Sequence, residues 1–203
     1  MKELLKNTII LLVITVLAGG ILGFVYDNTK DIIARQEEET KKAAYKNVFS
    51  KADDFVQCEL AIDENSRKAM DKMGFAEEDI VELIEAKDSS GNLMGYVFTI
   101  VTHEGYGGDI EFTMGVTNEG VLNGISILSI SETAGLGMEA EKVLQPQFAG
   151  RKAETIVYTK TGAKESNEVD AISGATITTN AITNGVNLGL YYFNEVLGGA
   201  EHE

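Results

Sequence analysis

An uncharged, mostly apolar run near the N-terminus constrains this chain more than any other feature. The run covers residues 7–26 and consists mainly of Ile, Leu, Val and Gly. As an α-helix it would span roughly 30 Å, the thickness of a bilayer's hydrocarbon core. Lys2 and Lys6 would also suit a cleaved signal peptide. However, apolar residues continue past Ala18-Gly19-Gly20 without an Ala-x-Ala cleavage pattern. We therefore expect a retained transmembrane helix behind a short tail, residues 1–6.

The charges flanking this run leave its orientation open. Only the immediate neighbours, Lys6 and Asp27, favour a cytoplasmic N-terminus. Residues 27–50 are rich in charge and in helix-forming residues, with acidic Glu37-Glu38-Glu39 facing basic Lys41-Lys42 along a helix surface. This segment is predicted to be a juxtamembrane helix. Its basic residues also mean that a count of the charges flanking the apolar run does not support a cytoplasmic N-terminus. These residues are Lys30, Arg35, Lys41, Lys42 and Lys46.

The remainder of the chain has the length and charge of one acidic domain. Lys2, Glu3 and Lys6 are the only charged residues before Asp27, so the rest has a net charge of −16, against −15 for the whole chain. About 150 residues make one domain of ordinary size. The predicted domain therefore covers residues 51–203. Its negative charge excludes nucleic acid as a natural partner, because DNA and RNA are polyanions.

Cysteine and histidine are too scarce for a metal centre. The chain has one cysteine, Cys58, and two histidines, His103 and His202. Iron–sulfur clusters and structural zinc sites need about four such ligands, so a redox role would require an organic cofactor. Cys58 shares its alternation with apolar Val56, Leu60 and Ile62, and this pattern predicts a core thiol on the inward face of a strand.

Between the juxtamembrane helix and the C-terminus, alternating apolar residues predict an antiparallel meander. A turn at Asp88-Ser89-Ser90-Gly91-Asn92 separates the first two strands, and Asn118-Glu119-Gly120 separates the next two. A short helix over residues 138–144 and a closing helix with Ile182, Val186, Leu190, Phe193, Val196 and Leu197 complete an α+β class. The predicted strands cover residues 79–86, 93–101, 110–116, 121–130 and 155–158.

The residues Asp170-Ala171-Ile172-Ser173-Gly174-Ala175-Thr176 form the pattern D-x-x-S-G-A-T just before the closing helix. Ser173 is a candidate N-cap, and Gly174 and Ala175 leave the backbone uncovered. The free N–H groups and positive dipole end of a helix favour a bound phosphate. A hydroxyl at this position can bond a phosphate or be esterified by one.

Two glycine-rich segments supply further candidate ligand contacts. Gly105-Tyr106-Gly107-Gly108 precedes a strand, and Ser131-Glu132-Thr133-Ala134-Gly135-Leu136-Gly137-Met138 joins a strand to a helix. Gly107 and Gly135 are expected where the backbone meets a planar ligand or needs a positive φ. In the second segment, Glu132 and Thr133 can bond a ligand's edge, and Leu136 can cover an aromatic face.

These motifs together resemble the FMN-binding subunits of two related respiratory complexes. That family shows G-Y-G-G, a stretch like S-E-T-P-G-L-G, then Q-F-x-G and D-x-x-S-G-A-T; here Ala134 replaces the usual proline, and Gln147-Phe148-Ala149-Gly150 supplies the third element. The subunits are the G subunit of the Rnf ion-translocating oxidoreductase and the C subunit of the sodium-translocating NADH:quinone oxidoreductase. The short chain is more similar to the former.

The resemblance implies FMN attached to Thr176 through a phosphoester bond made by a flavin transferase. It also implies a single-pass protein of the cytoplasmic membrane, with its domain outside the cytoplasm, that relays electrons among the other subunits of an ion-translocating ferredoxin:NAD⁺ oxidoreductase. A basic patch of Arg151, Lys152, Lys160 and Lys164 could steady the cofactor's negative charge. The residues expected to contact FMN are Tyr106, Gly107, Gly108, Glu132, Thr133, Gly135, Leu136, Gly137, Lys160, Asp170, Ser173, Gly174, Ala175, Thr178 and Thr179.

Two alternatives remain open from the sequence. The chain could be the C subunit of the quinone reductase, with the same chemistry in another complex. It could instead be a membrane-tethered sensory domain whose glycine-rich loops hold a ligand non-covalently. No substrate pocket with an acid and a base is indicated by the sequence, so we expect no independent catalytic site.

Overall fold

The computed structural model describes residues 1–199, which divide into two compact units. The first unit is Met1–Lys41, and the second begins at Lys42. Helix α1 (Lys2–Val48) starts in the first unit and ends in the second. Among the described residues it is the one helix long and apolar enough to cross a membrane. None of the residues in its most apolar stretch is buried. The predicted transmembrane and juxtamembrane segments are therefore continuous. His202 lies outside the described residues.

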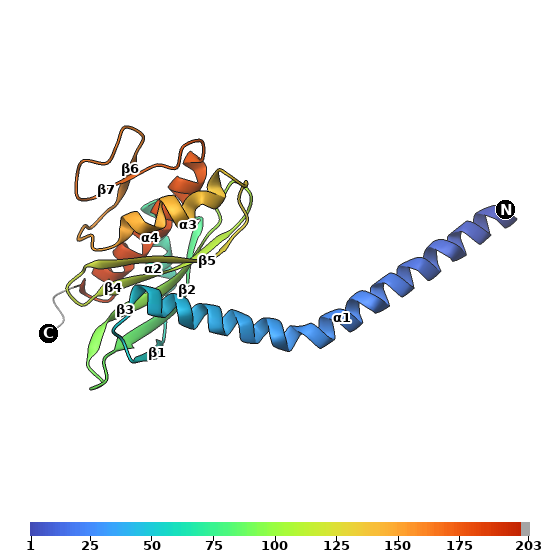
Figure 1. Ribbon diagram of the computed structural model, residues 1–203, viewed down its shortest axis with the longest axis horizontal. Helices are drawn as coiled ribbons and strands as arrows, with labels where there is room; N and C mark the ends of the chain where they lie inside the picture. The colour runs from blue at the N-terminus through green and yellow to red at the C-terminus, as the bar shows by residue number, and fades with distance from the viewer. Residues whose placement is uncertain (200–203) are drawn as a thin grey trace. The chain divides into compact units, whose positions relative to one another are not determined.

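The second unit contains a meander of five strands followed by short helical turns, two short strands and a long helix (Figure 1). The meander confirms the predicted α+β class. After the end of α1, the elements of the second unit are, in chain order and with η for 3₁₀ helices, β1 (Asp54–Cys58), α2 (Glu64–Lys72), β2 (Glu78–Lys87), β3 (Leu93–Thr102), β4 (Ile110–Thr117), β5 (Leu122–Ile130), η1 (Gly137–Glu139), α3 (Ala140–Val143), η2 (Gln145–Phe148), β6 (Val157–Thr159), β7 (Glu168–Asp170) and α4 (Thr176–Glu195).

The five strands pair in the order β1-β2-β3-β4-β5, and every neighbouring pair is antiparallel. Tight turns join β2 to β3 and β4 to β5, as the turn residues predict. In the first turn the Asp88 carboxylate accepts hydrogen bonds from the backbone N–H groups of Ser90 (2.8 Å) and Asn92 (2.9 Å). A bulge between Ile80 and Glu82 shifts the register of β2, so that Ile80 and Leu83 share one face of the sheet.

Each face of the sheet is covered by a different helix. On one face, α4 packs along β2, β3 and β4, and Phe98 and Ile100 of β3 are fully buried there with Ile182 of α4. On the other face, Val97 of β3 joins a smaller cluster with residues from the C-terminal end of α1. This cluster comprises Tyr45, Val48, Phe49, Ala52, Ile84, Ala86 and Val97.

The compact unit therefore begins before the predicted boundary at residue 51. Tyr45, Val48 and Phe49 are each no more than 6 % exposed, and the Tyr45 hydroxyl donates a 2.6 Å hydrogen bond to the Glu82 carboxylate. These apolar side chains cover the second face of the sheet, so the last turns of α1 belong to the core of this unit. In the sequence these positions read as a charged helix with scattered apolar residues.

Several local predictions need correction. Helix α2 was not predicted; Asp63 caps it by accepting a 2.7 Å hydrogen bond from the Ser66 N–H. The strand expected at residues 155–158 is β6 (Val157–Thr159), and it pairs in parallel with β7. Cys58, at the end of β1, packs against the core as predicted, but Val56 is 37 % exposed because β1 is an edge strand.

Candidate functional site

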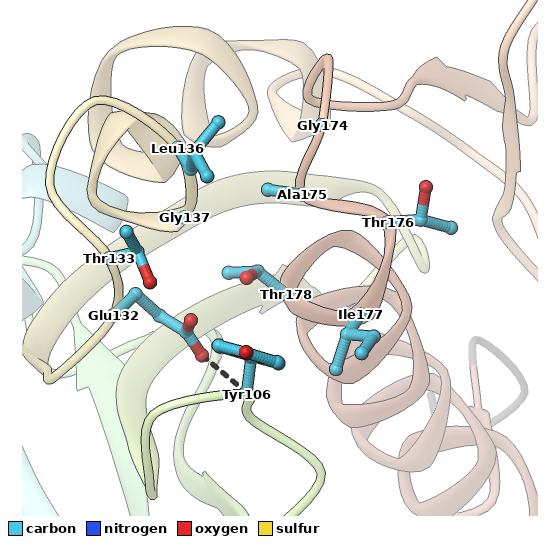
Figure 2. Close-up of a pocket in the computed structure, with 10 residues that line it drawn as sticks. All are labelled: Tyr106, Glu132, Thr133, Leu136, Gly137, Gly174, Ala175, Thr176, Ile177 and Thr178. Atoms are coloured by element: carbon cyan, nitrogen blue, oxygen red, sulfur yellow. Dashed lines mark hydrogen bonds between the residues drawn. The ribbon is translucent and has the colours of Figure 1, made fainter.

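A cavity of about 520 Å³ lies between the N-terminus of α4 and the two glycine-rich segments. Figure 2 shows the segment from Glu132 to Gly137 on one side of the cavity, the first turn of α4 on the other, and Tyr106 at a third edge. The volume is within the usual range for small-molecule sites. The lining residues are Tyr106, Glu132, Thr133, Leu136, Gly137, Gly174, Ala175, Thr176, Ile177 and Thr178.

The D-x-x-S-G-A-T motif forms a tight turn that ends at this cavity. Gly174 has a positive φ of 77°, which favours glycine, and α4 begins two residues later. Ser173 was predicted to be the N-cap, but Ala175 occupies that position and makes no side-chain capping bond. Thr179, one turn into the helix, holds the turn instead: its hydroxyl accepts a hydrogen bond from Ile172 N–H (3.1 Å) and donates one to the Ala175 carbonyl (2.9 Å).

This arrangement leaves the first turn of α4 open to a ligand. The first bond of the helical ladder runs from Thr179 N–H to the Ala175 carbonyl (3.0 Å). The N–H groups of the three preceding residues, Thr176, Ile177 and Thr178, therefore have no partner within the helix. They lie at the positive end of a 20-residue helix. An anionic group is the natural partner for such a terminus.

A carboxylate joins the two glycine-rich segments. Glu132 Oε1 accepts hydrogen bonds from the backbone N–H groups of Tyr106 (2.7 Å) and Gly107 (3.4 Å). Glu132 therefore fixes the loop that carries Tyr106, and this carboxylate oxygen is already occupied by protein donors. Sequence reasoning expected Glu132 to bond a ligand's edge; its second oxygen and its exposed neighbour Thr133 still face the cavity (Figure 2).

His103 closes the base of the same loop. Its Nδ1 lies 2.9 Å from an Asp109 carboxylate oxygen, and its Nε2 lies 3.4 Å from an Asp79 carboxylate oxygen. The Asp109 carboxylate, followed by Asp79, raises the pKa of His103 above its ordinary value, although partial burial opposes this. The two ends of the loop that carries Tyr106 are thus tied together across the β3–β4 connection.

Glycine is required in this region for two different reasons. Gly135 has a φ of 74° and open space around it, which confirms the positive φ predicted there. At Gly137, a Cβ would lie 2.6 Å from Thr178 Oγ1 and 2.7 Å from Glu132 Cβ. Glycine is needed there because the neighbouring side chains leave no room for a Cβ. Gly107 also needs close approach, because its Cβ would lie 2.1 Å from the Ser131 carbonyl oxygen.

The three threonines near the start of α4 have distinct surroundings. Thr176 is partly exposed at the outer edge of the cavity (Figure 2), and its hydroxyl makes no hydrogen bond within residues 1–199. Thr178 is 1 % exposed and lines the cavity wall. Thr179 is fully buried, and its hydroxyl is used in the turn described above. Of the three, Thr176 is the accessible hydroxyl.

The cavity does not gather every residue predicted from sequence. Asp170 ends β7, and its carboxylate accepts a 2.6 Å hydrogen bond from Ala163 N–H. Arg151, from the predicted basic patch, donates to the backbone carbonyls of Gln147 and Ser166. Conversely, Ile177 lines the cavity and is 51 % exposed, and sequence reasoning missed it because it resembled an ordinary helix residue. The predicted residues absent from the lining are Gly107, Gly108, Gly135, Lys160, Asp170, Ser173 and Thr179.

Comparison with known proteins finds two family models that match different parts of the chain. Residues 1–48 match the RnfG N-terminal region, and residues 105–191 match the FMN-binding domain. The chain is 33 % identical to the G subunit of the Na(+)-translocating ferredoxin:NAD(+) oxidoreductase complex of Acetobacterium woodii, over 96 % of this chain and 94 % of that protein. It is 28 % identical to the G subunit of the ion-translocating oxidoreductase complex of Methanosarcina acetivorans, over 94 % and 95 %.

Two crystal structures share the fold. The C subunit of the Na(+)-translocating NADH-quinone reductase from Parabacteroides distasonis has a TM-score of 0.56 at 17 % identity, covering 81 % of this chain and 95 % of that one. NqrC from Shewanella oneidensis has a TM-score of 0.51 at 16 % identity, covering 76 % and 88 %. The sequence similarity to G subunits extends over nearly the whole chain, whereas these two structures share the fold alone. This chain therefore belongs to the family of G subunits of ion-translocating oxidoreductase complexes and contains that family's FMN-binding domain.

Proposed function

We propose that this protein is a membrane-anchored electron carrier of an ion-translocating ferredoxin:NAD⁺ oxidoreductase, with FMN held in the cavity and its phosphate esterified to Thr176. The observation that carries the proposal is the open N-terminus of α4, where an accessible hydroxyl and uncapped N–H groups meet a cavity of suitable size. FMN's phosphate is the anion that such a terminus binds well.

Accessibility favours Thr176 as the attachment point. A flavin transferase must bring a flavin dinucleotide to the hydroxyl. The Oγ–P bond then forms as the phosphoanhydride P–O bond breaks, the leaving nucleotide monophosphate departs, and the hydroxyl proton passes to solvent. Thr178 and Thr179 are at most 1 % exposed, and the Thr179 hydroxyl is already bonded. Thr176 is partly exposed and stands at the positive end of the helix, where a phosphodiester's negative charge is stabilised.

Side chains around the cavity suit a planar aromatic ligand. Tyr106, Leu136 and Ile177 are 71 %, 40 % and 51 % exposed, which is high for residues of this size. An isoalloxazine ring packed among them would remove part of this apolar surface from water. The Thr178 hydroxyl makes no side-chain hydrogen bond within residues 1–199 and can donate to a ring heteroatom.

The bound flavin would supply one- and two-electron chemistry, and the protein would supply attachment, orientation and control of potential. The family's G subunits are components of multi-subunit complexes, so we infer that neighbouring subunits donate and accept the electrons. Helix α1 would hold the domain at the bilayer as a single-pass anchor. We place the domain on the extracytoplasmic side, an assignment that protease access to intact spheroplasts would test.

Substitution of the acceptor tests the covalent attachment directly. Thr176→Ala, expressed with the flavin transferase, is expected to show no fluorescent band on a denaturing gel while its circular dichroism stays unchanged, because only a partly exposed hydroxyl and methyl are lost. Thr178→Val is the matched control, which keeps Thr176 and should keep the band. A fluorescent Thr176→Ala band would rule out this attachment point.

A further inference from the structure

Two carboxyl groups interact near the loop that carries Tyr106. Glu78 begins β2 and is fully buried, and Glu104 follows β3. The Glu104 carboxylate accepts hydrogen bonds from the side-chain amides of Asn180 (3.0 Å) and Asn184 (2.7 Å), both on α4. Thr102 lies between the two acids: its hydroxyl donates to Glu78 Oε1 (3.4 Å) and accepts from Glu104 N–H (3.3 Å).

Glu78 has one oxygen that no protein donor satisfies. Among the described residues, Glu78 Oε2 is the only buried side-chain oxygen or nitrogen without a hydrogen-bond partner. A buried carboxylate oxygen without a donor is costly. The Glu104 carboxylate interacts with Glu78 and is itself an acceptor. Two carboxylates can form a hydrogen bond only when one of them carries a proton.

The charges around the pair favour the neutral form of Glu78. Glu77 and Glu104 both add negative charge near it. The closest guanidinium, Arg67 of α2, donates to the Glu78 backbone carbonyl (3.1 Å) and pairs with Asp79 (2.6 Å) and Asp71 (3.1 Å). His103 is likewise occupied with Asp79 and Asp109, and α4 contributes only the uncharged amides of Asn180 and Asn184.

Glu104 is connected to the cavity wall through two short segments. Glu104 precedes Tyr106 by two residues on the same loop. Asn180 is four residues after Thr176, so one helical turn, roughly 6 Å of axis, separates the Glu104 contact from the start of α4. Charge that enters the cavity is therefore close enough to act on the pair through the protein interior, where screening is weaker than in water.

We propose that Glu78 and Glu104 form a proton-binding site whose occupancy is linked to the redox state of the flavin in the adjoining cavity. The link rests on the proposed function. When electrons enter the cavity, the added negative charge favours the singly protonated pair, and Glu78 takes one proton from water. When the electrons leave, the proton returns to water. One O–H bond forms and later breaks, and no other reactant takes part.

The acidity of Glu78 fits such a switch near neutral pH. Burial, followed by the negative charge of Glu104, raises the pKa of Glu78 from 4.5 to about 7. The side chain is thus neutral below this value and charged above it. Added negative charge in the cavity would raise the pKa further, so that at pH 7 reduction of the flavin increases the protonated fraction.

The first experiment needs no flavin. Infrared titration of the full chain in detergent, prepared without flavin transferase, should show one carboxylic acid losing its proton near pH 7. Glu78→Gln should lack this signal, and Glu77→Gln, which removes the same charge from the exposed neighbour, should keep it. Should Glu78→Gln be poorly folded, Glu104→Gln should move the signal to lower pH because it removes the partner charge. A wild-type chain without this signal would overturn the proposal.

The second experiment measures proton uptake on reduction of the flavin-loaded full chain at pH 7. Wild type and Glu77→Gln should take up more protons than Glu78→Gln, by as much as one per reduced protein. Equal uptake in all three would overturn the link. A chain that shows the infrared signal but never binds flavin would instead refute the proposed function, and with it the redox link, while leaving the carboxyl pair in place.

Discussion

The Glu132 carboxylate lies 2.7 Å from the backbone nitrogen of Tyr106 and accepts its hydrogen bond. The two residues are 26 positions apart and come from different connections of the sheet, one between β3 and β4 and the other after β5. Their contact ties together the two glycine-rich segments that border the cavity. The same oxygen also receives Gly107 N–H, so a single side chain holds two consecutive residues of the Tyr106 loop.

Removing this carboxylate should loosen the loop. Glu132→Ala is expected to lower the free energy of unfolding by about 1 kcal/mol, a modest value because the site is partly exposed. It should also shift the absorption of the bound flavin, since Tyr106 is freed. Thermal unfolding and visible spectra of the full chain measure both. Glu139→Ala is the control, because Glu139 makes only a 3.8 Å surface ion pair with Lys142. If the two variants behave alike, Glu132 does not hold the loop.

Adding one methyl group should separate the two roles of glycine. In Gly137→Ala the new Cβ meets Thr178 and Glu132 below normal contact distance, so we expect a loss of about 1–3 kcal/mol together with an altered flavin spectrum. In Gly135→Ala the Cβ enters open space, and only the positive φ costs about 1–2 kcal/mol. Its flavin spectrum should stay that of wild type. Identical spectra for both variants would contradict the assignment of Gly137 to the cavity wall.

The Thr179 hydroxyl is expected to stabilise the motif turn. Thr179→Val keeps the shape but leaves the Ile172 N–H without its acceptor in a buried place, so the free energy of unfolding should fall by about 1–3 kcal/mol. Thr183→Val, one turn later, removes only a bond to a helix carbonyl and should have a smaller effect. Chemical denaturation of the full chain compares them. A larger loss for Thr183→Val would show that the turn does not depend on Thr179.

The second compact unit should fold without the membrane anchor if it keeps the end of α1. A chain beginning at Gln36 retains Tyr45, Val48 and Phe49 and should be a monomer that still accepts flavin. A chain beginning at Lys51 lacks these three side chains, each of which contributes about 1.5–3 kcal/mol by burial. That sum rivals the whole stability of a typical domain, so this chain should not fold. Gel filtration and circular dichroism measure whether each chain is folded. Equal folding of both chains would show that the end of α1 is not needed for the core.

The sequence alone was enough to predict the membrane helix, the antiparallel meander and the motif that leads to Thr176. These features depend on local patterns: a long uncharged run, alternating apolar residues between turn residues, and a small-residue turn before a helix. Strands β2 to β5 each begin and end within one residue of their predicted ranges. Such patterns persist because each is set by the chain's own periodicity and backbone preferences.

Tertiary structure alone decided which side chains meet. The end of α1 belongs to the core because its apolar residues cover a sheet face that other elements leave open. Ala175, not Ser173, is the N-cap of α4. The buried Thr179 hydroxyl, one helical turn after Ala175, holds the motif turn through its hydrogen bond from Ile172 N–H. The proposed pairing of Glu78 with Glu104 has no local signature, because it depends on how β2, the end of β3 and α4 pack together. Periodicity determines which face a residue occupies, but contacts between distant segments depend on how those faces pack.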